Sequence, residues 1–137
     1  MPQPLTVQPA SPAAGFPQAI GASDANAAVI ALYKQAQSAQ AAGQFGQAAS
    51  AYERAMRLAP RNAFVWSALA RLHLQMQQPL QAINKARKSN SLADGNPYVL
   101  QANWNIIATA ENATGDSAAA RQASAEANKY AKLTTTR

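Results

Sequence analysis

The sequence contains no cysteine and only one histidine, His73. The missing cysteines exclude disulfide bonds, cysteine-ligated zinc and iron–sulfur clusters, and one histidine cannot build a multi-histidine metal site. Carboxylates are also few, with 6 in 137 residues, and they are too scattered to form a catalytic pair. No nucleophile elbow, phosphate loop, dinucleotide fingerprint or zinc-protease motif occurs. We therefore expect a protein that is not an enzyme and that uses no cofactor or metal.

Aromatic residues are scarce as well, at 7%, and no apolar run approaches the roughly 18 residues that a membrane-spanning helix needs. Hydrophobic residues nevertheless make up 48% of the chain, and 35 of them are alanines. Such small side chains favour thin, closely packed helices over a sheet sandwich. The net charge of +6 favours acidic partners in general, without choosing among nucleic acid, anionic lipid and envelope polymers.

Proline is concentrated at the N-terminus, where residues 1–23 hold five of the 8 prolines and no charged residue. Proline removes backbone donors and disfavours helix in the residue before it. The segment therefore predicts a disordered, extended tether. It lacks the basic region and the apolar region of a secretory signal peptide.

The rest of the chain predicts six helices and no strand. Apolar residues recur three and four positions apart, as in Val29, Leu32 and Tyr33. Cap residues place the helix starts after Ser23 or Asp24 and after Asn62, Asn96 and Asp116, whereas Pro79 opens a helix and Gly43 ends one. The expected helices cover residues 25–42, 45–58, 63–77, 79–91, 97–113 and 117–133.

An internal repeat is the strongest signal in the sequence. Ala48 and Ala82 match at a shift of 34 residues, within a longer aligned stretch. Trp66 and Trp104 match at a shift of 38, which indicates four inserted residues at the turn formed by residues 94–97. Repeats of this length indicate stacked helix hairpins, each of which buries its apolar face against the next.

The repeat resembles the tetratricopeptide repeat (TPR), whose pattern places bulky, small, glycine, alanine, aromatic and proline residues at fixed positions. Residues 29–62 supply every one of them, whereas residues 63–96 and 101–134 depart from the pattern at the aromatic position. The resemblance implies an all-α fold, with three hairpins forming a short right-handed solenoid over residues 24–134 and a tail at 135–137. We expect Trp66 and Trp104 to lie in its core.

In this family the first helix of each repeat lines a concave groove that holds a protein partner. The matching positions of this sequence are Tyr33, Gln37, Gln40, Phe64, Ser67, Arg71, Leu74, Asn105, Thr109 and Asn112. Amide side chains both donate to and accept from a peptide backbone, and Tyr33, Phe64 and Leu74 offer an apolar anchor. Some members clamp a C-terminal carboxylate with a Lys/Asn/Arg set. Only Arg71 and Asn105 resemble that set here, so chaperone-tail binding is not predicted.

Most other basic residues fall on the second helices. They are expected to form a band on the convex face, made of Arg54, Arg57, Arg61, Lys85, Arg87 and Lys88. No aromatic residue interleaves them in the sequence, and no recognition motif occurs, so support for nucleic-acid binding is weak.

The family implies a protein–protein interaction adaptor. A proline-rich tether before a short repeat domain is similar to bacterial envelope lipoproteins, in particular the small TPR lipoproteins that activate a peptidoglycan synthase, a class A penicillin-binding protein. That resemblance implies a periplasmic protein, anchored to the outer membrane by a lipid ahead of this chain. Two alternatives stay open: a scaffold for a pilus, secretion or outer-membrane complex, and a polyanion or nucleic-acid binder that uses the convex band.

Overall fold

The structure, a computed structural model, describes residues 13 and 15–135, and it shows six α-helices and no strand within them. A short 3-10 helix, η1 (Ile20–Ala22), precedes the six. These are α1 (Ala27–Ala41), α2 (Phe45–Leu58), α3 (Ala63–Gln75), α4 (Pro79–Leu92), α5 (Pro97–Ala113) and α6 (Ser117–Thr134). Each helix lies within two residues of its predicted bounds.

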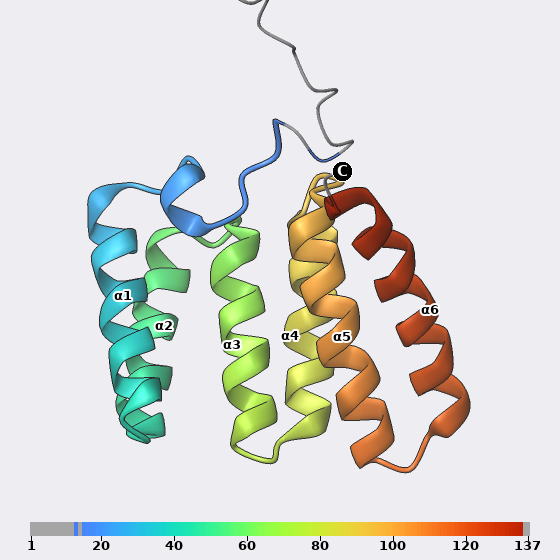
Figure 1. Ribbon diagram of the computed structural model, residues 1–137. Coiled ribbons are helices and arrows are strands. Elements are labelled where there is room, and N and C mark those ends of the chain that lie inside the picture. The colour runs from blue at the N-terminus through green and yellow to red at the C-terminus, as the bar shows by residue number, and fades with distance from the viewer. Residues whose placement is uncertain (1–12, 14, 136–137) are drawn as a thin grey trace, which may run out of the picture.

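Consecutive helices pair as three antiparallel hairpins, α1–α2, α3–α4 and α5–α6, which stand side by side (Figure 1). Further contacts join α2 to α3 and α4 to α5, and α3 also touches α5 directly. The predicted all-α solenoid of three hairpins is thereby confirmed. No helix in the described part of the chain has the length and hydropathy needed to cross a membrane.

Side-chain caps define where several helices begin. The caps predicted at Asn62, Asn96 and Asp116 are confirmed, because each side chain accepts a backbone N–H of the first turn at 3.0 Å. The cap expected at Ser23 or Asp24 is wrong. Helix α1 begins at Ala27, and Asn26 caps it by accepting the Val29 N–H at 3.0 Å.

All three hairpins turn in the same way. In each hairpin, the second residue beyond the first helix is left-handed, with φ of +76° at Gly43, +59° at Gln77 and +88° at Gly115. The N–H of the following residue returns to the carbonyl five positions back, at 2.8 Å for Gln44 and 2.9 Å for both Gln78 and Asp116. This 6→1 bond is the mark of the Schellman motif. Gln77 therefore occupies a position that favours glycine.

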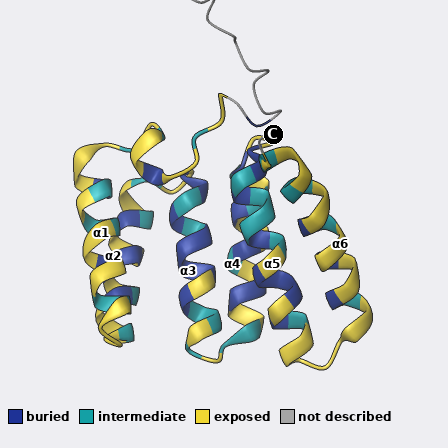
Figure 2. Cartoon of the chain, in the orientation of Figure 1, coloured by how far each residue is buried: buried dark blue, intermediate teal, exposed yellow. Residues whose placement is uncertain are grey.

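Alanines form the contacts between helices, and buried positions gather where the helices face one another (Figure 2). Fully buried alanines (0% exposed) occur in five of the six helices: Ala36, Ala48, Ala55, Ala70, Ala82, Ala86 and Ala110. Larger buried groups, among them Tyr52, Leu69 and Leu72, fill the remaining space. The backbones approach closely because a methyl group is all that separates them at these points.

The two tryptophans depart from expectation, because both are only partly buried. Trp66 donates its indole N–H to the carbonyl of Pro60 at 2.8 Å, and Trp104 packs against the edge of the core between α3 and α6. Neither ring is therefore among the buried side chains that fill the core.

A buried polar chain joins the second and third hairpins. The side-chain amide of Asn103 in α5 donates to the Ser89 hydroxyl at 2.7 Å and to the side-chain oxygen Oδ1 of Asn90 at 2.9 Å. Ser89 donates in turn to the backbone carbonyl of Ala63 at 2.7 Å. Within the described residues, the Asn103 Oδ1 atom is buried without a partner. This row of hydrogen bonds thus fixes α5 against α4 and the start of α3.

The expected tether falls into two parts. Residues 1–12 and 14 lie outside the described residues, whereas residues 15–23, which we name the N-terminal arm, lie along the ends of the helices (Figure 1). Ile20 of the arm is 5% exposed and packs with Val29, Ala55 and Val65. Ordered structure therefore begins before Asp24. Of the expected C-terminal tail, residues 136–137 lie outside the described part.

We predict that Gln77→Gly stabilises the protein by about 0.5–1 kcal/mol, because glycine adopts the left-handed conformation without a Cβ penalty. Denaturant unfolding of the two proteins measures the difference. Gln81→Gly is the matched control, since Gln81 is exposed inside α4 and glycine there should cost about 1 kcal/mol. Equal losses in both variants would contradict the strain assigned to Gln77.

Candidate partner-binding groove

The first two repeats share a cluster of tyrosine and glutamine side chains. The rings of Tyr33 (α1) and Tyr52 (α2) meet edge to face, with centroids 5.5 Å apart and planes at 69°. The Tyr52 hydroxyl donates to Gln40 Oε1 at 2.9 Å, and the Gln40 amide donates to Gln75 Oε1 of α3. These contacts tie α1, α2 and α3 together and hold the side chains of Tyr33 and Gln40 in place.

Burial controls the titration of this cluster. It raises the pKa of Tyr33, whereas the nearby Arg71 guanidinium opposes the rise. Burial also raises the pKa of Tyr52 to about 12; Tyr33 adds to the shift and Arg71 opposes it. Both phenols therefore stay neutral at physiological pH, and they act there as hydrogen-bonding and apolar groups.

A hollow of about 420 Å³ lies between α3 and α5. Its lining comes from both helices: Arg71, Leu74, Tyr98, Gln101, Ala102, Asn105, Ile106 and Thr109. Arg71 is exposed and forms no ion pair with any described residue. The hollow thus combines a free cation, amide groups and an apolar floor. Such a surface suits an extended peptide that offers a carboxylate or carbonyl oxygens to Arg71.

The structure brings some of the residues expected in the groove together and separates others. Arg71, Leu74, Asn105 and Thr109 line one hollow, and Tyr33 and Gln40 belong to the adjoining cluster. Ser67 is only 7% exposed and has little surface to offer.

The remaining three expected residues lie elsewhere. Phe64 packs with the arm and with Val65 near the helix starts. Gln37 and Asn112 are exposed, and neither lines the hollow. Their assignment to a partner stays a prediction.

Tyr98 and Gln101 line the hollow, although position matching to the family did not select them. Both share a helical face with Asn105 and Thr109, since the spacing of 98, 101, 105 and 109 follows three- and four-residue steps. This periodicity within α5 is the sequence signal that would have revealed them.

The expected convex band is also divided. Lys85 and Lys88 hold their ammonium groups 5.4 and 5.9 Å from the centroid of the Trp66 ring. Lys85 and Arg57 line a second hollow of about 300 Å³. Although no aromatic residue interleaves these cations in the sequence, Trp66 of α3 reaches two of them in the folded chain.

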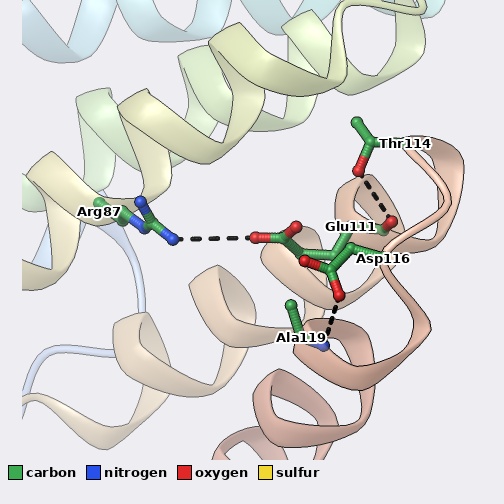
Figure 3. Close-up of polar contacts among 5 residues, drawn as sticks. All are labelled: Arg87, Glu111, Thr114, Asp116 and Ala119. Atoms are coloured by element: carbon green, nitrogen blue, oxygen red, sulfur yellow. Dashed lines mark hydrogen bonds and ion pairs between the residues drawn. The ribbon is translucent and has the colours of Figure 1, made fainter.

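The other three basic residues stand apart from this group. Arg87 pairs with Glu111 of α5 at 3.7 Å (Figure 3). Arg61 lines cavities near the helix starts, and Arg54 is exposed on α2. No group of three or more His, Cys, Asp or Glu residues in the described part could hold a metal ion.

Comparisons with known proteins agree with this architecture. A family model described as tetratricopeptide repeat matches residues 39–99. The solved globular C-terminal domain of P. aeruginosa LpoP is 35% identical, with a TM-score of 0.70, and the match covers 77% of this chain and 97% of that domain. The second TPR of Spaghetti (RPAP3), solved with the HSP90 peptide SRMEEVD, shares the fold at 17% identity, with a TM-score of 0.69 over 76% of this chain and 93% of that one. No curated protein sequence matches.

We predict that stability falls as the pH rises from 10 to about 12. Tyr52 ionises near 10 in the unfolded chain and near 12 in the folded one, so the unfolded state binds fewer protons in this interval and becomes favoured. Below pH 10 Tyr52 keeps its proton in both the folded and the unfolded state, so its full contribution to the free energy of unfolding is present. Tyr52→Phe should lower stability below pH 10, because the bond to Gln40 is lost, but its decline above pH 10 should be shallower. Parallel declines in denaturant unfolding would contradict this.

Proposed function

This chain belongs to the tetratricopeptide repeat family, and we propose that it is a non-enzymatic adaptor that binds another protein through its groove. The observation that carries the proposal is the hollow between α3 and α5. Arg71 there has no ionic partner in the described chain, and it stands beside Asn105 and Gln101 over the apolar side chains of Leu74 and Ile106. A buried salt bridge to a partner would satisfy Arg71, and the amides would bind backbone groups.

We further propose that the partner is a class A penicillin-binding protein and that docking activates its peptidoglycan synthesis. Two observations support this narrower function. The repeat domain matches the LpoP domain over nearly that domain's full length, and a proline-rich segment precedes it, as in the envelope lipoproteins that the sequence resembles. Activation requires only that the adaptor bind the active state of the synthase more tightly than the inactive state. The same resemblance supports a periplasmic location.

A second contact surface is favoured by the group formed by Trp66, Lys85 and Lys88. Two ammonium groups three residues apart on α4 face one indole, and neither forms an ion pair within the described residues. Mutual repulsion between such charges is relieved when an anion binds. This surface suits a polyanion, or an acidic region on the same protein partner. A scaffold function in a larger envelope complex would use the same groove, and co-purification from envelope extract separates it from the synthase proposal.

We predict that Arg71→Gln weakens binding to a purified class A penicillin-binding protein about tenfold or more, because a central arginine is a typical hot spot. Titration calorimetry measures the affinity, and the rate of glycan polymerisation reports activation. Arg121→Gln is the matched control, because it removes the same charge from an exposed site on α6. Equal effects of the two variants would remove Arg71 from the interface. Absence of binding by the unchanged protein would remove the synthase as partner.

We predict that the paired variant Lys85→Gln, Lys88→Gln reduces the salt dependence of binding to an anionic polymer such as heparin. The variant Arg121→Gln, Lys132→Gln removes the same charge from α6 and serves as its control. Affinity measured over a range of salt concentrations gives the slope for each protein. A slope that changes equally in both variants would show that net charge, and not the surface around Trp66, governs the contact.

A further inference from the structure

The N-terminal arm is bound to the domain at widely separated points. It runs from the start of α5 across the start of α3 to the start of α1 (Figure 1). Asn62 donates to the Ser23 hydroxyl at 3.3 Å, and Asn96 donates to the carbonyl of Pro17 at 2.8 Å. Gln18 donates to the Tyr98 hydroxyl at 3.2 Å. The arm therefore bridges all three repeats.

Asn62 and Asn96 each serve two purposes with one side chain. The Oδ1 atom caps a helix, through Phe64 N–H in one case and Tyr98 N–H in the other, and the Nδ2 atom holds the arm. The two residues are 34 positions apart and therefore equivalent in the repeat. Serine or aspartate would cap a helix as well as asparagine does, and Asp116 caps α6 in this chain. Unlike an ionised aspartate, the amide can also donate a hydrogen bond, and at these two positions it donates to the arm.

Asn26 provides the comparison within the same molecule. Its Oδ1 atom caps α1 at 3.0 Å, as the other two asparagines cap α3 and α5, but among the described residues its side chain forms no hydrogen bond with the arm. An aspartate precedes Asn26 and Asn96 alike by two positions, so their local charges are similar. The two sites differ in whether the cap holds the arm.

The arm is fastened at these points and is not packed along its length. A cavity of about 300 Å³ lies between the arm and the domain, with Phe16 and Pro17 on one side and Phe64, Leu92 and Val99 on the other. Phe16 is 37% exposed. A segment held by few hydrogen bonds and one buried side chain, Ile20, belongs to the least stable part of a fold and opens before the rest.

We propose that Asn62 and Asn96 form a receptor for the chain's own N-terminal arm, and that the arm is a releasable clasp. When the arm is docked, Pro17 and Gln18 lie beside the start of α5, and Gln18 donates to the hydroxyl of Tyr98 at the edge of the groove hollow. When it is released, Tyr98 is free for a partner. The nine residues of the arm then add about 30 Å of extended chain to the reach of whatever precedes them.

Hydrogen exchange of the intact chain tests the clasp. Asn96→Asp keeps the cap but sets a carboxylate against the carbonyl of Pro17. Deuterium uptake in residues 15–23 should therefore become about five- to tenfold faster, while uptake in α5 stays unchanged. Asn26→Asp adds the same charge and keeps the cap of α1, and it should leave the uptake of the arm unchanged. Equal uptake in the arm of the two variants would overturn the proposal.

A second variant keeps the test decisive if Asn96→Asp loosens the whole domain. Tyr98→Phe removes only the acceptor for Gln18, and it should speed exchange in the arm by a smaller factor without affecting the helices. No acceleration in the arm of this variant, together with uniform acceleration throughout Asn96→Asp, would also reject the clasp. Neither measurement uses a partner protein, so its outcome is independent of the proposed synthase.

Discussion

Close contact between alanine-lined helices is the constraint on which the rest of this structure depends. In each hairpin, methyl groups at 0% exposure separate neighbouring backbones, and the stacking of the hairpins reuses the same contacts. Such contacts leave little volume for large side chains. The bulk of the core is therefore supplied by a few residues such as Tyr52, Leu69 and Leu72, each placed where three helices meet.

The same constraint determines what the surfaces of the molecule can offer. Side chains that do not fit between the helices lie at their edges, and there they have polar neighbours. Trp66 lies beside two lysines, and Tyr33 lies beside a second tyrosine and near Arg71. The groove thereby gains aromatic and amide groups of fixed orientation, although the sequence contains few aromatic residues. Rigid first helices carry these groups, so a partner would meet a surface that needs little reorganisation.

The helices were predictable because their signals are local. Helix caps are indicated by Asn62, Asn96 and Asp116, and turns by Gly43 and Gly115. Each of these boundaries therefore depends on a few neighbouring residues. The repeat period then predicted how the helices pair.

Features that depend on distant residues were harder to predict. Ile20 looks isolated in a proline-rich segment, and only the surface made by Val29, Ala55 and Val65 explains its burial. The pairing of Trp66 with Lys85 and Lys88, and the place of Tyr98 beside Arg71, likewise require the folded arrangement.

The buried chain from Asn103 through Ser89 to the carbonyl of Ala63 makes the third repeat specific to its position. The four extra residues predicted at the turn formed by residues 94–97 lie instead inside α5, which has 17 residues against 13 in α3, so periodic packing alone would not fix the offset of the last hairpin. Polar groups sealed from water tolerate few alternative pairings. The three hairpins are consequently not interchangeable modules. The polar groups between the second and third hairpins specify the order of these two hairpins. A hairpin duplicated or exchanged by recombination would lack the matching polar groups.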